Sequence, residues 1–197
     1  MTFSRILFAS SAILGIAACS QPADEPGPPE PAENTAAQAD TAQTADSPVA
    51  MARLANADGT QVGTVSLVDT DGTMSLELEL MNLPAGEHAF HLHTTGQCDA
   101  PDFQSAGGHL NPFDKSHGRL SDNGKHLGDF PNITVAENGS FTQSYPIESD
   151  QDVAAVQSAI FDADGTAVMI HEGADDYRSD PAGDAGSRIA CGVVERS

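Results

Sequence analysis

The feature that most constrains the fold of this chain is the alternation of apolar and polar residues between closely spaced turns. Within residues 51–80, Ala-Asp-Gly and Thr-Asp-Gly turns separate segments in which the two kinds of residue alternate. Successive side chains of a strand point to opposite faces, so the leucines of Ser-Leu-Glu-Leu-Glu-Leu (residues 75–80) would share one face and the glutamates the other. Further strand-like runs lie at residues 132–135, 139–147, 166–171 and 188–194.

Many short strands with regular turns are typical of an antiparallel β-sandwich or barrel. Only residues 152–158 have the composition of a short helical turn, while residues 84–86 and 94–125 are too irregular to be strands. The part of the chain from residue 49 onward, about 150 residues, is long enough for one domain with its own core. The sequence therefore predicts a single all-β domain over residues 49–197.

The first 48 residues differ in composition from the rest. Residues 1–18 contain one positive side chain, Arg5, followed by an apolar segment too short to span a bilayer, which predicts a signal peptide. The segment ends in Ile-Ala-Ala-Cys, which resembles the bacterial lipobox, so Cys19 is expected to become a lipidated N-terminus. The alternative is an ordinary signal peptide with a chance cysteine. Residues 19–48 are rich in Ala, Pro and acidic residues, which predicts a disordered acidic linker.

Cysteine usage agrees with an exported protein. With Cys19 assigned to lipid, Cys98 and Cys191 remain as an even pair in an oxidising compartment. A disulfide between them would close a loop of more than 90 residues, which the chain-entropy model values at roughly 4 kcal/mol. The alternative is two buried free thiols.

Histidines are concentrated in one stretch. Six of the seven fall within residues 88–129, and the seventh is His171. His91 and His93 are two apart in a strand-like run, so their rings would point the same way. The residues that follow at intervals of eight, nine and three are His109, His117, His126 and Asp129. Imidazoles with one carboxylate are the ligands that a borderline transition metal takes in proteins.

Six sequence blocks resemble, in order and spacing, those of copper–zinc superoxide dismutases: AFHLH, GGHLNP, KSHG, KHLGDF, IHEGADD and AGSRIACGV. The likeness extends over about residues 49–196, and the signal peptide and linker are similar to the bacterial extracytoplasmic branch. The resemblance implies a Greek-key β-barrel with long metal-binding and electrostatic loops. It further implies dismutation of superoxide to oxygen and hydrogen peroxide, which would protect the cell envelope. Both monomers and homodimers occur among bacterial members.

The resemblance also implies ligand sets for copper and zinc, in which His109 is shared because its imidazole would bridge the two ions. Four nitrogens suit tetragonal Cu(II), and three nitrogens with one carboxylate make a closed tetrahedral zinc site. Copper is assigned to His91, His93, His109 and His171, and zinc to His109, His117, His126 and Asp129.

Three other residues receive roles. Asp175 matches the carboxylate that links a copper histidine to a zinc histidine in the family, the alternative being a solvated surface Asp. Arg188 matches the arginine that guides the anion to copper. His88 has strand parity opposite to that of the copper pair and is expected to make a structural hydrogen bond instead.

The formal net charge of −21 argues against a nucleic-acid partner and would repel superoxide at long range. Five of the eight basic residues nevertheless lie between His109 and Cys191, and some are expected to line the copper entrance. The alternative is that they only neutralise acids in the same loops. The five are Lys115, Arg119, Lys125, Arg178 and Arg188.

Two other functions fit a histidine-rich exported domain. A carrier that buffers copper and zinc would need neither Asp175 nor Arg188, and a zinc hydrolase would need an open ligand position and a general base. Metal analysis combined with a superoxide assay separates these functions from dismutation.

Overall fold

The computed structural model describes residues 47–197, so the signal peptide, Cys19 and most of the linker lie outside the described residues. No helix of the described part is long and apolar enough to cross a membrane. The strands are β1 (Ala50–Asn56), β2 (Gln61–Thr70), β3 (Thr73–Leu80), β4 (Gly86–His88), β5 (Phe90–His93), β6 (Ile133–Val135), β7 (Phe141–Pro146), β8 (Ala167–His171) and β9 (Arg188–Arg196). They are accompanied by helix α1 (Val153–Ile160) and a 3-10 turn, η1 (Gln104–Ala106).

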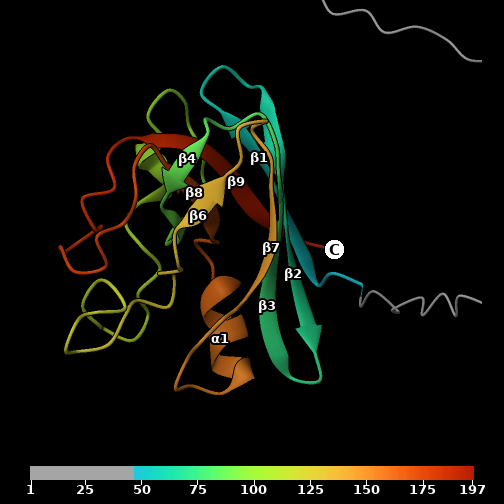
Figure 1. The fold of residues 1–197 in the computed structure, drawn as a ribbon. Coiled ribbons are helices and arrows are strands. Elements are labelled where there is room, and N and C mark those ends of the chain that lie inside the picture. Colours follow the sequence, from blue (N-terminus) through green and yellow to red (C-terminus); the bar gives the residue numbers. More distant parts are fainter. Residues whose placement is uncertain (1–46) are drawn as a thin grey trace, which may run out of the picture. The chain divides into compact units, whose positions relative to one another are not determined.

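Every strand pair is antiparallel. Seven strands form one sheet in the order β5-β8-β9-β1-β2-β3-β7, and β4 pairs with β6 separately. The chain leaves β3 near one edge of the sheet and enters β5 at the opposite edge, which is the kind of return that defines a Greek key. Figure 1 shows the sheet curled, with β2, β3 and β7 on one side and β4, β6 and β8 on the other. The predicted all-β, antiparallel fold is confirmed.

The alternating pattern of the sequence determines which strand faces enter the core. In β3 the residues alternate between buried and more exposed, and its three leucines are buried while both glutamates are exposed. Strand β8 has no exposed face, because all five of its residues are buried. The four residues of β5 are buried as well, with Phe90 and Leu92 in the apolar core and two histidines on the other face. One face of β5 is therefore available for polar chemistry inside the protein.

Helix α1 covers residues 153–160, two residues beyond the predicted helical turn. Asp152 is its N-cap, and the Asp152 carboxylate accepts a hydrogen bond from the Ala155 amide at 2.8 Å. Val156 and Ile160, four residues apart and so on one face, are buried against the core.

The prediction that residues 84–86 form no strand is wrong at Gly86, which begins β4 and pairs with Val135.

The long loops are connected to the barrel by a disulfide. As predicted, Cys98 is bonded to Cys191 of β9, with a Cα–Cα distance of 5.7 Å. The two cysteines are 93 residues apart, a separation for which the chain-entropy model gives between about 4 and 5 kcal/mol of stabilisation. No strand forms within residues 94–125 of the described chain, also as predicted. The disulfide therefore holds an irregular segment in place that has little regular structure of its own.

Candidate metal centre

Two loop segments lie against strand β5 and are bonded to its backbone. The Leu92 amide donates to the Gly128 carbonyl at 2.9 Å, the Leu110 amide donates to Leu92 at 2.8 Å, and the Gly128 amide donates to Leu110 at 2.9 Å. A side chain at Gly128 would collide with the Leu92 carbonyl and the Leu110 amide, so only glycine permits this approach. Four of the six residues directly adjacent to these three are ligand-type residues: His91, His93, His109 and Asp129. Backbone pairing thus brings ligand-type side chains from three segments together.

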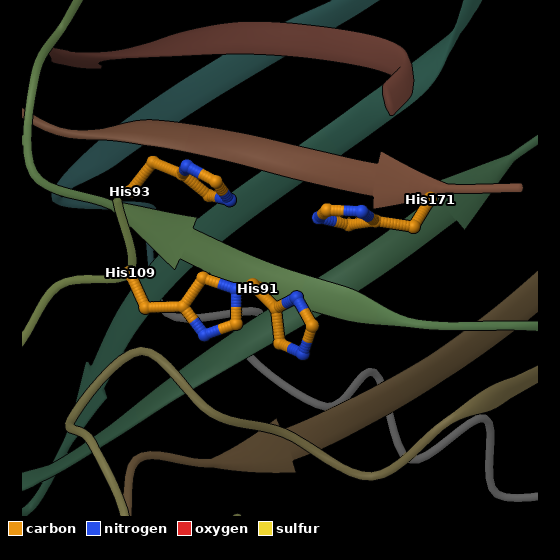
Figure 2. Close-up of side chains that lie close together, drawn as sticks. All are labelled: His91, His93, His109 and His171. Atoms are coloured by element: carbon orange, nitrogen blue, oxygen red, sulfur yellow. The ribbon is translucent and has the colours of Figure 1, made fainter. Parts of the chain in front are cut away.

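The four histidines predicted for copper converge on one point (Figure 2). His91 and His93 come from β5, His171 from the end of β8, and His109 from the loop beside β5. One ring nitrogen of each lies within 4.8 Å of those of the other three. The His91 and His109 ring centroids are 3.9 Å apart. A strand pair and one loop therefore build a compact group of four nitrogens.

The four residues predicted for zinc form a second group that shares His109 with the first. The ring centroids of His109, His117 and His126 lie between 5.1 and 5.6 Å from one another. Asp129 lies among them, and its Oδ1 accepts a hydrogen bond from His109 Nδ1 at 2.8 Å. The structure thus brings together every residue of both predicted ligand sets, and His109 is the one residue common to them.

Six imidazole nitrogens in these groups are buried and make no hydrogen bond. Such atoms are rare in folded proteins, because a polar atom that loses its hydrogen bonds to water on burial and gains no new one destabilises the folded state. The Nδ1 atoms of His117 and His126 lie 3.2 Å from carboxylate oxygens of Asp129 but not in hydrogen-bonding geometry. The six atoms are His91 Nδ1, His93 Nε2, His109 Nε2, His117 Nδ1, His126 Nδ1 and His171 Nε2. Unshared nitrogens that point at a common centre are what a metal ion requires.

Asp175 fixes one histidine of each group. Its Oδ2 accepts a hydrogen bond from His91 Nε2 at 2.8 Å, and its Oδ1 accepts one from His117 Nε2 at 2.9 Å. Both rings therefore carry their proton on Nε2 and turn Nδ1 inward. Asp175 is 3 % exposed, so the alternative of a solvated surface residue is wrong. A side chain at Gly183 would occupy the position of the Asp175 carboxylate.

Two copper-side rings are oriented by backbone carbonyls instead. His93 Nδ1 donates to the Gly107 carbonyl at 2.9 Å, and His171 Nδ1 donates to the Gly186 carbonyl at 3.2 Å. Each hydrogen bond leaves Nε2 as the nitrogen that faces the centre of the group. The tautomer of each of these rings thus follows from its neighbours.

Sequence reasoning missed Asn132 and Tyr177, which hold Asp175 in place. The Asn132 side chain donates to the Asp175 carbonyl at 3.0 Å and accepts from the Asp175 amide at 2.8 Å. The Asn132 amide donates to the Tyr177 hydroxyl at 2.8 Å, and the Tyr177 amide donates to Asp175 Oδ1 at 2.6 Å. Asn132 lies 43 residues from Asp175 in the sequence. No local pattern could have revealed a pairing over that separation.

The side chains of Arg188 and His88 both contact backbone carbonyls at hydrogen-bonding distance. The Arg188 guanidinium donates to the Phe103 and Gly107 carbonyls, both at 2.7 Å. Gly107 is the residue that orients His93, so Arg188 lies beside the copper-side group. His88 is buried outside both groups, as expected, with its ring nitrogens 2.9 Å from the carbonyls of His171 and Pro84.

Burial lowers the pKa of three copper-side imidazoles, those of His93, His109 and His171. Loss of water lowers the pKa of His93 to about 2 and that of His171 to about 3, and nearby histidines add to both shifts. Burial likewise lowers the pKa of His109 to about 4, although its hydrogen bond to Asp129 opposes the shift. Neutral imidazole is the form that binds metal, so this environment favours metal binding at neutral pH.

In the zinc-side group the pKa of one histidine, His117, is raised instead of lowered. Burial acts to lower the pKa of His117, but its contacts with Asp129 and Asp175 outweigh burial and raise the pKa to about 9. Burial would raise the pKa of Asp129, yet the surrounding imidazoles hold it well below its usual range. Without metal, the protonated His117 ring therefore compensates two buried carboxylates.

Comparison with known proteins gives a consistent result. The family model described as "Copper/zinc superoxide dismutase (SODC)" matches residues 61–194. "Superoxide dismutase [Cu-Zn] 1" of Aquifex aeolicus is 45% identical over 145 residues, which is 73% of this chain and 86% of that protein. The relative from Caulobacter vibrioides is 38% identical over 141 residues, 70% of this chain and 80% of its own length.

Solved structures resemble the same part of the chain. A SOD-like protein from Bacillus subtilis has a TM-score of 0.65 and 35% sequence identity, covering 73% of this chain and 96% of its own. The Cu/Zn superoxide dismutase from Brucella abortus has a TM-score of 0.60 and 26% identity, covering 74% and 98%.

The shifted pKa values predict that the metal-free protein is most stable at about pH 7. Below that pH His93, His109 and His171 are protonated in the unfolded chain but stay neutral in the folded protein, because their folded pKa values are lower. The free energy of unfolding therefore falls as the pH drops toward 4. Above about pH 7 the folded His117 retains a proton that the unfolded chain has lost, so stability falls as the pH rises toward 9. Urea unfolding at pH 4.5, 7 and 9 measures both effects.

The control for this prediction is His117→Gln, which should remove the alkaline loss and leave the acid loss unchanged. Equal stability of the metal-free wild type at pH 7 and pH 9 would contradict the assignment of the raised pKa to His117.

Proposed function

Because the chain belongs to the copper/zinc superoxide dismutase family, we propose that its two adjoining histidine groups hold copper and zinc and that it dismutes superoxide at this site. The protein is an oxidoreductase, and its cofactors are copper and zinc. Two superoxide ions and two protons yield one dioxygen and one hydrogen peroxide. The observation that carries the assignment is the set of six buried imidazole nitrogens without a hydrogen bond, divided between two groups that share His109.

The residues present suit the two ions differently. His91, His93, His109 and His171 offer four nitrogens to copper. Burial favours the neutral forms of His93, His109 and His171. His109, His117, His126 and Asp129 offer zinc a closed set of four, which leaves no position for the bound water that a zinc hydrolase needs. A structural role for zinc follows from this ligand count.

Copper, when bound, supplies the one-electron chemistry that takes an electron from one superoxide and gives it to the next. His109 faces both groups, with Nδ1 bonded to Asp129 and Nε2 unshared on the copper side. In the proposed cycle Nε2 takes up a proton and returns it, while the Nδ1 side keeps the ring in place. His91 and His93 are 0% exposed, while the residues His109 and His171 retain 7% and 4% of their surface.

Changes at single ligands should separate the two metals. His93→Gln is expected to lower copper content and activity by about 100-fold or more, because even residues behind the ligands cost 10–100-fold in affinity. Zinc content should stay close to one per chain. His126→Gln should lose zinc and keep most of its copper. Metal content by mass spectrometry and inhibition of a superoxide-dependent dye reduction measure these outcomes.

Each of these variants serves as the control for the other. A wild-type protein that binds both metals and fails to dismute superoxide would contradict the proposed function and favour a metal carrier. Loss of both metals in both variants would contradict the assignment of separate copper and zinc ligands.

Arg188 is proposed to attract superoxide to the copper side, because its guanidinium lies beside the copper group and lowers the pKa of His93 and His171 by its charge. Arg188→Gln should reduce kcat/KM about tenfold and weaken its dependence on ionic strength, since screening acts on this charge. Arg53→Gln removes the same charge from an exposed position of β1 and should change neither. A wild-type rate that rises with salt would contradict steering.

Export and anchoring complete the proposal. Residues 1–18 are proposed to be a cleaved signal peptide, Cys19 a lipidated N-terminus, residues 19–48 an acidic tether and residues 49–197 the enzyme domain, held at a bacterial membrane in the periplasm or cell envelope. A disulfide is consistent with an oxidising compartment. Mass spectrometry should show that the mature protein begins at Cys19 and carries acyl chains, and an unmodified N-terminus would contradict the anchor.

A homodimer is also compatible with the family, and sedimentation of the purified chain distinguishes it from a monomer.

A further inference from the structure

A small cavity lies on the outer side of the zinc-side group, with Asp129 as part of its lining. It has a volume of about 70 Å³, several times the roughly 10–15 Å³ that one water molecule needs. Its walls come from three parts of the chain: the loop with Arg119 and Lys125, the end of β7 with Pro146, and the loop between β8 and β9 with Tyr177. The dismutase mechanism uses neither the cavity nor its two cations.

The cavity combines an apolar surface with two positive charges. Phe130, Pro131 and Pro146 supply the apolar part. The Arg119 guanidinium lies 5.8 Å from the centroid of the Tyr177 ring, and Lys125 Nζ lies 5.6 Å from that of Phe130. Both cations therefore rest against aromatic rings at the cavity wall.

Neither cation forms an ion pair within 4.0 Å in the described part of the chain, although the charges of Glu148 and Asp129 act on Lys125 from farther away. The chain has 29 acidic and eight basic residues, yet within residues 47–197 no Lys or Arg forms an ion pair within 4.0 Å of an Asp or Glu. In the same part of the chain Arg119 makes no hydrogen bond. Lys125 donates to the carbonyls of Asp129 at 3.1 Å and Glu148 at 3.5 Å, which leaves one of its three N–H groups free. Arg119 and Lys125 therefore border one cavity, and neither has an ion-pair partner within 4.0 Å in the described part of the chain.

We propose that this cavity binds a small aliphatic carboxylate, with the carboxylate between Arg119 and Lys125 and the alkyl group against Phe130, Pro131 and Pro146. A guanidinium presents two parallel N–H groups that match a carboxylate, and a lysine adds a third charged donor. An inorganic oxyanion would leave the apolar wall unused, and a neutral solute would leave both cations unpaired. The cavity has room for more than one water molecule and therefore for a small ion such as acetate or propionate.

The carboxylates that already line the cavity do not fill this role. The oxygens of Asp129 are taken by His109 and by the Gly118 and His126 amides. Glu148 is exposed, and its contact with Lys125 is through its backbone carbonyl. The Glu148 side chain instead adds negative charge at the rim and should weaken anion binding.

Propionate is the probe for the test, added to the copper(I)–zinc protein at constant ionic strength. The chain has two tyrosines and no tryptophan, so the ring resonances of Tyr177 are readily assigned in an NMR spectrum. Saturable shifts of the Tyr177 ring are expected, with half-saturation on the order of millimolar, as suits a ligand with few atoms. Phosphate at the same ionic strength should bind several-fold more weakly.

Three variants test whether the cavity residues determine the affinity for propionate. Arg119→Gln should weaken propionate about tenfold or more, because a charge-assisted hydrogen bond is lost. Arg178→Gln, which removes an equal charge from an arginine bonded to Leu120 outside the cavity, should leave the affinity unchanged. Glu148→Gln should tighten binding about threefold by removing a repulsive charge. Metal content and melting temperature establish that each variant is folded.

Several outcomes would overturn the proposal. Shifts that never saturate, or that persist unchanged in Arg119→Gln, would mean that the cavity holds no carboxylate. Equal weakening by Arg178→Gln would reduce the effect to net charge. Phosphate that binds as tightly as propionate would exclude a contribution from the apolar wall.

Discussion

Burial of Asp129 and Asp175 among histidine rings is the interaction on which the rest of the structure depends. Both carboxylates are 3 % exposed, and both are paired with imidazoles rather than with Lys or Arg. A buried charge is costly unless it is paired and hydrogen-bonded. Here each carboxylate meets two or more rings, so the cost is met by contacts that also fix where each ring points.

The fixed rings explain why so much irregular chain is held so firmly. Each oriented imidazole uses one nitrogen on a carboxylate or a carbonyl and turns the other toward the metal position. Those partners come from the long loops, and the loops are in turn secured by the Cys98–Cys191 disulfide, by Arg188 and by Asn132. Strands β5 and β8 supply the rigid base. A small shift of any loop would leave a buried nitrogen or carboxylate without its partner.

Three of the eight positive charges of this acidic chain lie in two separate regions. Arg188 lies with the copper-side group, where an anionic substrate must arrive. Arg119 and Lys125 lie on the other side of the zinc loop, around a cavity with apolar walls. Net charge therefore describes this molecule poorly, since exposed charges are screened over about 10 Å and local groupings decide what each region attracts.

Local signals in the sequence were sufficient for the strands. Alternation of leucine and glutamate in β3 and the turns beside it determine a half-buried antiparallel strand, because side-chain direction has a period of two. Where alternation is lost, as at Gly86, the strand depends on its partner, and local sequence carries too little information to find it. Most of the candidate site was likewise within reach, because the histidine blocks are distinctive and resemble a known family.

By itself, the sequence predicted an antiparallel β-sandwich or barrel, a disulfide between two cysteines and the set of residues from which a metal centre would be built. Only the tertiary structure decided that Asn132 holds Asp175, that Arg188 bonds to the carbonyl that orients His93, and that Arg119 and Tyr177 border one cavity. The physical reason is distance along the chain. Periodicity and turn chemistry act over a few residues, whereas these contacts join residues separated by up to 81 positions and exist only once the barrel has closed.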